Sequence, residues 1–234
     1  MNMDNQIYTI PVQDALREPG SCPFCAMYTR IESGAVAFII GPAYMEDDVR
    51  EQTNRLGFCA RHMQQLYDSQ NRLGLSLMLH SRLQALLRDM EMDELHPKKK
   101  PSRRLKTNAQ PTCYVCREIN ETFVRYMDTF FYLWKRDKEA AALIKGLPGF
   151  CMPHYRQMMQ ASGDALNKQQ QAEFIKMARS VQRAFMQALE ADLDWFIRKF
   201  DYRYAEEPWN NAQDALIKAM ALYNQAGDRY AEKK

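Results

Sequence analysis

All six cysteines of this 234-residue chain belong to one pattern that occurs twice, and this pattern constrains the fold more than any other feature. Each copy has a C-x-x-C pair and, 33 or 34 residues further on, a C-x-x-H pair that follows the dipeptide Gly-Phe. The first copy contains Cys22, Cys25, Cys59 and His62, and the second contains Cys113, Cys116, Cys151 and His154. The chain is therefore an internal duplication with a period of about 91 residues.

Each copy holds a complete set of metal ligands. Three thiolates and one imidazole form a closed tetrahedral set that suits zinc. In the first turn of a helix, positions i and i+3 share a face, so C-x-x-H can supply two ligands to one ion. Helix N-termini also stabilise thiolates through unpaired N–H groups and the helix dipole. We therefore predict two zinc ions per chain, each bound by the four ligands of one copy and joining the starts of its first and third helices.

Other uses of the cysteines stay open at this point. An iron–sulfur cluster can also be held by three cysteines and one histidine. Cys22-Pro23-Phe24-Cys25 resembles a glutaredoxin-type redox motif, but such motifs follow a strand in a βαβ context and the second copy has Tyr114 in place of Pro23. A disulfide framework suits an oxidising compartment, and the N-terminus shows no export signal.

The basic charge of the chain is concentrated in residues 96–112. This segment carries six Lys or Arg residues and no acidic residue, whereas the whole chain has a net charge of +3, so the remainder is slightly acidic (3 minus 6 gives −3). Three of the ten prolines also lie there. We predict a basic flexible linker between a first metal-binding repeat at 1–95 and a second at 113–234 that includes extra C-terminal helices.

Hydrophobic periodicity and turn residues predict an all-α fold of duplicated helical units with an added C-terminal helix. No segment alternates as a half-buried strand does. The expected helices cover residues 26–40, 47–56, 59–72, 75–90, 118–134 and 138–145, a segment from 151, and residues 168–200 and 209–230. Gly57 is expected to end the second of these helices, and Pro208 to stand at the start of the last.

Three groups of apolar residues are assigned to helix faces. The 75–90 helix is expected to bury one leucine-rich face, the aromatic run at 130–134 is interpreted as core, and the last helix is expected to bury a third face. The members are Leu75, Leu79, Leu83, Leu86 and Met90; Phe130, Phe131, Tyr132, Leu133 and Trp134; and Leu216, Met220 and Tyr223.

Several classes of protein lack support. No apolar run approaches the roughly 18–20 residues of a membrane span. The sequence contains no H-E-x-x-H, G-x-x-x-x-G-K-[ST], G-x-G-x-x-G or G-x-S-x-G motif. A closed set of three cysteines and one histidine also leaves no open position for a catalytic water. We therefore expect a soluble, cytoplasmic, non-enzymatic protein.

The chain resembles a family of uncharacterised bacterial proteins, a domain of unknown function. The doubled C-P-x-C…G-F-C-x-x-H arrangement and the later F-D-Y-R-Y segment at 200–204 carry the resemblance. It implies that all eight motif residues are ligands, and it implies no particular activity.

Three functions follow as hypotheses. The first is a zinc-stabilised helical scaffold that binds a protein or peptide. The second is a redox or metal-responsive sensor whose thiolates release zinc on oxidation. The third is nucleic-acid binding through Lys98–Lys106, which we do not favour because no recognised reading motif accompanies this segment.

Overall fold

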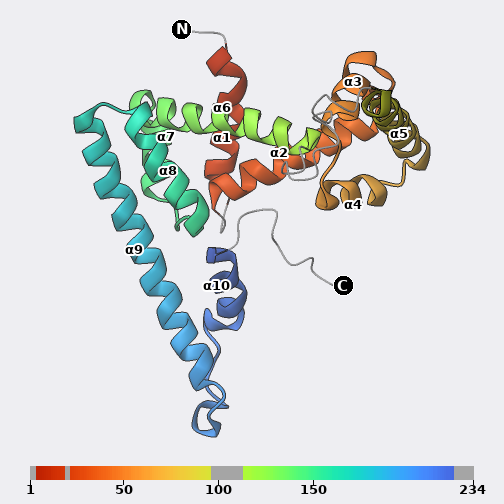
Figure 1. The fold of residues 1–234 in the computed structure, drawn as a ribbon. Coiled ribbons are helices and arrows are strands. Elements are labelled where there is room, and N and C mark those ends of the chain that lie inside the picture. The colour runs from red at the N-terminus through yellow and green to blue at the C-terminus, as the bar shows by residue number, and fades with distance from the viewer. Residues whose placement is uncertain (1–3, 19–21, 96–112, 224–234) are drawn as a thin grey trace. The chain divides into compact units, whose positions relative to one another are not determined.

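The described part of the chain is mostly helical. The computed structural model describes residues 4–18, 22–95 and 113–223, and within these ranges it contains ten α-helices, three short 3-10 helices and no strand (Figure 1). The α-helices are α1 (Asp4–Arg17), α2 (Pro23–Ile40), α3 (Asp47–Leu56), α4 (Ala60–Asp68), α5 (Arg72–Leu95), α6 (Tyr114–Arg136), α7 (Lys138–Lys145), α8 (Met152–Ala165), α9 (Lys168–Arg198) and α10 (Ala215–Tyr223). The 3-10 helices are η1 (Pro42–Met45), η2 (Tyr202–Tyr204) and η3 (Ala212–Asp214). The predicted fold class is confirmed.

Local capping residues explain several of the helix ends. Gly57 ends α3 with φ at 65°, a conformation that glycine adopts without steric cost. The Asp137 carboxylate accepts the N–H groups of Glu139 and Ala140 at the start of α7. Asn167 and Gln170 form a capping box at the start of α9. These signals are local, and the corresponding boundaries were predicted to within one residue.

Several helix boundaries differ from the prediction. Helix α5 covers Arg72–Leu95 rather than 75–90, and α6 covers Tyr114–Arg136 rather than 118–134. The helix expected at 59–72 ends at Asp68, because Gln70 takes φ of 66° and the chain starts α5 in a new direction. The last helix begins at Ala215 rather than 209, after a turn in which Asn210 has φ of 52°. Its expected end at 224–230 lies outside the described residues.

Helix α1 was not predicted from the sequence. Its residues are mixed in polarity and Pro11 lies inside it, so no clear periodicity marks it. The structure buries Val12, Ala15 and Leu16, and α1 packs against α7. Gln13 donates a hydrogen bond to Asp137 at 3.2 Å. Tertiary contacts therefore stabilise a helix that local propensity leaves undecided.

The buried face of α10 was predicted wrongly. Leu216, Met220 and Tyr223 are exposed, and Ala215 and Leu222 are buried instead. The helix is apolar on almost every side, so periodicity cannot choose between its faces. Packing against α9 and α8 makes the choice.

The leucine-rich face assigned to α5 was also partly wrong. Leu75 is buried as expected, but Leu83 and Met90 are exposed. Met78 and Ala85 are buried in their place, and α5 packs against α3 and α4. This helix too carries apolar residues on more than one face.

The described residues form two compact units. Unit 1 lies within residues 1–29 and 123–234, and unit 2 within 30–122. Both boundaries fall inside a helix, since α2 begins in unit 1 and ends in unit 2, and α6 does the reverse. The units therefore divide the chain differently from the sequence repeats at 1–95 and 113–234. The expected linker at 96–112 lies outside the described residues.

Aromatic side chains fill the core of unit 1. Phe24, Phe130, Phe131, Phe150 and Phe174 are almost fully buried and contact one another with ring centroids 4.9–6.1 Å apart. Such tilted and edge-on contacts add to the free energy gained by burial. In the aromatic run of α6, Phe130, Phe131 and Leu133 are buried, as predicted. Tyr132 and Trp134 are only partly buried.

A buried glutamine fixes the turn that leads into α8. The Gln182 side chain on α9 accepts the Phe150 N–H at 3.0 Å and donates to the Phe150 carbonyl at 3.0 Å. Both residues are buried, so water cannot replace these bonds. Gln182 therefore positions the residue that directly precedes Cys151.

We predict that Gln182→Met destabilises the protein by about 2–4 kcal/mol, because the Phe150 N–H and carbonyl lose their partners while side-chain volume is nearly unchanged. Chemical denaturation followed by circular dichroism measures the change. Gln187→Met, at an exposed position of the same helix, is the matched control and should change stability by less than about 0.5 kcal/mol. Equal effects of the two substitutions would contradict this role.

Candidate metal centres

The eight predicted ligands form two groups, one in each unit. Centre 1, in unit 1, consists of Cys22, Cys25, Cys151 and His154. Centre 2, in unit 2, consists of Cys59, His62, Cys113 and Cys116. Within each group, the ligand atoms all lie within 4.8 Å of one another, so each group could hold a metal ion.

The pairing of the motifs differs from the prediction. Each centre combines the C-x-x-C of one copy with the C-x-x-H of the other, so the expectation that each ion is bound within one copy is wrong. Helix length gives the reason. With 18 and 23 residues, α2 and α6 extend about 27 and 35 Å from their C-x-x-C pairs. The next helices, α3 and α7, have 10 and 8 residues and are too short to bring the chain back.

In centre 1, three sulfur atoms surround a single imidazole nitrogen. The Sγ atoms of Cys22, Cys25 and Cys151 lie 3.8, 3.4 and 3.2 Å from His154 Nδ1. Cys25 Sγ is also 3.6 Å from Cys151 Sγ. One ring nitrogen has a single proton or a single lone pair, so it cannot make three hydrogen bonds at once. A shared metal ion explains the convergence better.

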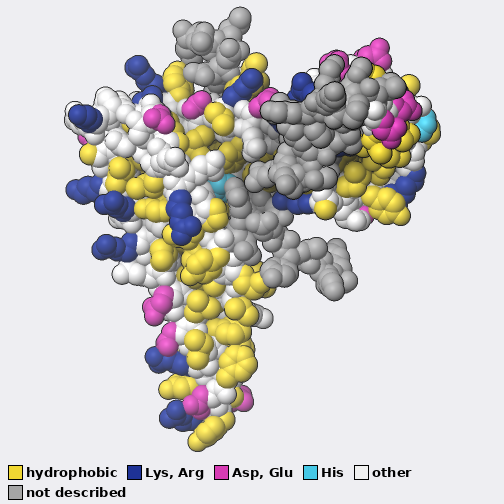
Figure 2. All heavy atoms as spheres, in the orientation of Figure 1, with side chains coloured by type: hydrophobic (Ala, Val, Ile, Leu, Met, Phe, Trp, Pro, Cys, Tyr) yellow, Lys and Arg dark blue, Asp and Glu magenta, His cyan; other side chains and the backbone are white. Residues whose placement is uncertain are grey.

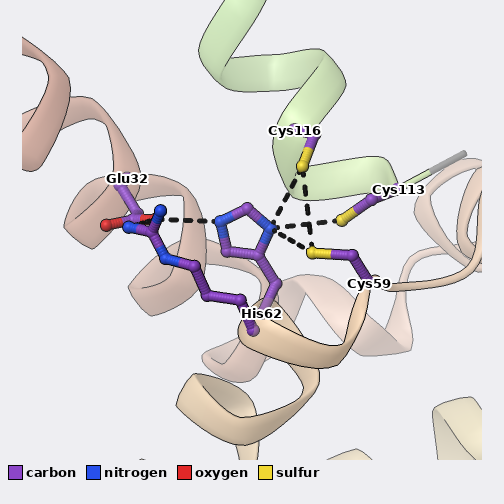
Figure 3. A network of polar contacts seen from close by, with 6 residues as sticks. Glu32, Cys59, His62, Cys113 and Cys116 are labelled. Atoms are coloured by element: carbon purple, nitrogen blue, oxygen red, sulfur yellow. Dashed lines mark hydrogen bonds and ion pairs between the residues drawn. The ribbon is translucent and has the colours of Figure 1, made fainter. Parts of the chain in front are cut away.

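Centre 2 repeats this arrangement, as Figure 3 shows. The Sγ atoms of Cys59, Cys113 and Cys116 lie 3.2, 3.3 and 3.3 Å from His62 Nδ1, and those of Cys59 and Cys116 are 3.9 Å apart. In a regular tetrahedron around zinc, ligand atoms are about 3.6–3.8 Å apart, given sulfur at about 2.3 Å and nitrogen at about 2.0–2.1 Å. The observed separations in both centres fall close to these values.

Every predicted ligand lies at the start of a helix. Cys59 and Cys151 are the N-cap residues of α4 and α8, and each histidine lies three residues later. Cys22 and Cys113 directly precede α2 and α6, and their carbonyls accept backbone N–H groups of the first turn. Unpaired N–H groups at these ends favour thiolate sulfur. The repeated C-x-x-C and C-x-x-H spacings therefore place two ligands on one face of each first turn.

The glycine of the Gly-Phe dipeptide before each C-x-x-H is required for a different structural reason in each copy. A Cβ atom on Gly57 would lie 2.5 Å from the Arg82 guanidinium, and Gly57 also has a positive φ. A Cβ atom on Gly149 would lie 2.4 Å from the ring of Phe185. Both positions need glycine so that the chain can enter the ligand-bearing turn.

The electrostatic surroundings of centre 1 are apolar. Burial raises the pKa of the Cys22 thiol to about 12 and lowers the pKa of His154 to about 4. A hydrogen bond from Cys22 lowers the pKa of Cys151, but its contact with Cys25 and burial outweigh this effect and raise it to about 12. Three thiolates are therefore costly here without a cation to balance their charge. A divalent ion would supply that charge, and its binding would displace protons.

Centre 2 has a charged environment instead. Burial opposes the charge on His62, but its hydrogen bonds with Cys113 and Glu32 raise its pKa to about 10. Burial likewise opposes the thiolate of Cys113, yet His62 and the backbone N–H groups of Cys116 and Cys59 lower its pKa to about 6. Centre 2 is also more open, because Cys59 and Cys116 are only half-buried, whereas Cys22 alone is half-buried in centre 1.

Glu32 and Arg61 are part of the surroundings that the sequence analysis missed. Glu32 lies on α2, is buried, and accepts a hydrogen bond from His62 Nε2 at 2.9 Å. Arg61 forms an ion pair with the same carboxylate oxygen at 2.5 Å. Glu32 is the lone acid in a mostly apolar helix, and this could have marked it as a functional residue. Nothing in the sequence connects it to His62, which lies 30 residues away.

The chain belongs to DUF6062. The model of this family of unknown function matches residues 3–229. The family resemblance suggested by the doubled motif is therefore confirmed. No curated protein and no solved structure matches the chain. In this member of DUF6062, no helix among the described residues combines the length and the apolar composition that a membrane-spanning segment needs.

We predict that double substitutions reveal the pairing. Cys25→Ser with Cys151→Ser should leave about one metal ion per chain, because both changes fall in centre 1. Cys25→Ser with Cys59→Ser should leave none, because each centre then loses a ligand. Elemental analysis of the purified proteins gives the ion count, and the reverse result would favour pairing within each copy.

Proposed function

We propose that this member of DUF6062 is a non-enzymatic, cytoplasmic helical scaffold that holds two structural zinc ions and binds another protein or peptide. The single observation that carries the proposal is the convergence of three sulfur atoms on one imidazole nitrogen in each unit. Four protein ligands complete the coordination of zinc and leave no position for a reacting water. Such a site contributes to folding rather than to catalysis.

Zinc fits the centres for chemical reasons. It prefers tetrahedral coordination by cysteine and histidine and has no redox chemistry of its own. Each ion would join two helices whose starts are far apart in sequence, α2 with α8 and α4 with α6. Because the four ligands come together only in the folded chain, the free energy of zinc binding adds to the free energy of unfolding.

We predict about two zinc ions per chain in protein purified without added metal, and a large fall in the melting temperature when a strong chelator removes them. Elemental analysis and circular dichroism measure the two effects. Less than about one zinc per chain, or a coloured protein containing iron, would contradict the zinc assignment. An iron–sulfur cluster is the alternative that such a colour would favour.

The binding part of the proposal depends on exposed apolar side chains of unit 1. They lie on α10, at the C-terminal end of α9 and on the turn between α9 and η3, along the lower part of the view in Figure 2. The members are Ile197, Phe200, Tyr202, Leu216, Ile217, Met220 and Tyr223, which we call the α10 surface. Ile217 and Tyr223 are 70% and 71% exposed. Contiguous apolar patches of this kind are typical of protein-binding sites.

The charges near the α10 surface favour a protein partner over a nucleic acid. Lys218 is the charged residue within α10, and it pairs with Asp214 at 2.7 Å. Arg203, in the adjoining turn, pairs with Asp201 at 2.6 Å. These cations are already balanced by carboxylates, so the surface suits an apolar segment such as one face of an amphipathic helix. The basic residues 98–106 lie outside the described residues.

We predict that a photo-crosslinking amino acid at Ile217 captures a specific protein in cells, whereas the same group at the exposed Lys176 of α9 does not. Ile217→Lys should then abolish binding of that protein in purified form without changing zinc content or helicity. Equal capture at both positions, or binding unchanged by Ile217→Lys, would contradict the α10 surface as the binding site.

The partial exposure of Cys59 and Cys116 favours a second candidate, a thiol-based sensor. Thiolates that oxidants can reach release zinc on oxidation. Mild peroxide treatment distinguishes the two functions. Fast, thiol-reversible release of zinc that changes partner binding while the helices stay intact would favour the sensor, and slow release would favour the scaffold.

A further inference from the structure

Glu32 occupies a position from which it acts on a metal ligand without touching the metal. Its Oε1 atom accepts hydrogen bonds from His62 Nε2 at 2.9 Å and from Arg61 at 2.5 Å. The other ring nitrogen, Nδ1, faces the three sulfur atoms of centre 2 (Figure 3). The Glu32 carboxylate therefore contacts one side of the His62 imidazole, and the three cysteine sulfur atoms contact the other side.

The equivalent position of the other copy carries a phenyl ring. Glu32 is the seventh residue after Cys25, and Phe123 is the seventh after Cys116. Phe123 stacks on the imidazole of His154, with ring centroids 5.2 Å apart and planes inclined by 27°. The same helix position thus contacts the ligand histidine in both units, through a carboxylate in one and a hydrocarbon face in the other.

A second pair of equivalent positions also has a charged residue in centre 2 and an uncharged residue in centre 1. Arg61 directly precedes His62 and pairs with Glu32, whereas Pro153 directly precedes His154. The two copies therefore differ by a coupled exchange, in which an acid and a base in centre 2 correspond to a phenylalanine and a proline in centre 1. Because Arg61 and Glu32 form an ion pair, the two charged residues of centre 2 act together.

This difference between the two centres is expected to change how strongly the histidine binds a metal ion. A carboxylate that accepts the second N–H of a ligand histidine fixes the tautomer and ring orientation and raises the basicity of the coordinating nitrogen. A phenyl ring packs against the imidazole but accepts no such hydrogen bond. Removal of an outer carboxylate partner typically lowers metal affinity about 10- to 100-fold.

We propose that Glu32, held by Arg61, is a positioning residue that fixes His62 as an Nδ1 ligand and makes centre 2 bind its ion differently from centre 1. This inference rests on the proposed metal binding. The duplicated motifs then form two inequivalent centres, one supported by a charged pair and the other enclosed by aromatic rings.

The test uses full-length protein loaded with ¹¹³Cd, whose NMR signal reports on each centre separately. Two signals are expected, and Cys59→Ser and Cys151→Ser assign them by removing one each. Glu32→Gln should shift the centre 2 signal alone and lower the affinity of that centre for Cd²⁺ about 10- to 100-fold in a chelator competition. Absence of both signals in the unsubstituted protein would instead refute the proposed metal binding.

Two further variants separate positioning from a loss of structure. Glu121→Gln removes an exposed acid from α6 in unit 2 and should leave both signals and affinities unchanged. Glu32→Phe combined with Arg61→Pro copies the residues of the other centre and should lower centre 2 affinity while circular dichroism shows the helices intact. The proposed role of Glu32 is wrong if Glu32→Gln changes neither the centre 2 signal nor the affinity of centre 2. It is also wrong if this substitution shifts both signals.

Discussion

The meeting of three sulfur atoms with one imidazole nitrogen is the constraint on which each unit depends. Each meeting point joins the starts of two helices, α2 with α8 in unit 1 and α4 with α6 in unit 2. The groups are too crowded for ordinary hydrogen bonding and too strongly charged, once deprotonated, to lie together without a cation. The aromatic core of unit 1 and the buried polar contacts of unit 2 pack around these points.

The exchange of motifs between copies follows from the lengths of two helices. A C-x-x-C pair at the start of α2 or α6 is carried away from the C-x-x-H pair of its own copy by the helix between them. It meets the C-x-x-H pair of the other copy instead. Each unit therefore contains residues from both copies, so neither copy alone contains the ligands of a complete centre.

The two copies carry the same candidate ligands in different surroundings. In centre 1, burial alone lowers the pKa of His154, whose ring lies against Phe24 and Phe123. In centre 2, burial raises the pKa of Glu32, but the contacts with His62 and Arg61 lower it below its usual value, so the carboxylate is charged. Identical ligand sets thus lie in different electrostatic environments, and this difference provides a physical basis for different behaviour of the two centres.

The sequence by itself determined the helical class, most helix boundaries and the eight cysteine and histidine residues that form the two groups. These features depend on spacing within a few residues, such as the i to i+3 relation in C-x-x-H or the caps at Asp137 and Asn167. Only the tertiary structure decided which motifs pair, which face of α10 is buried and that Glu32 meets His62. Those outcomes depend on how the helices place residues that are far apart in the sequence. The spacing of residues within one motif does not determine the distance between two motifs in the folded chain.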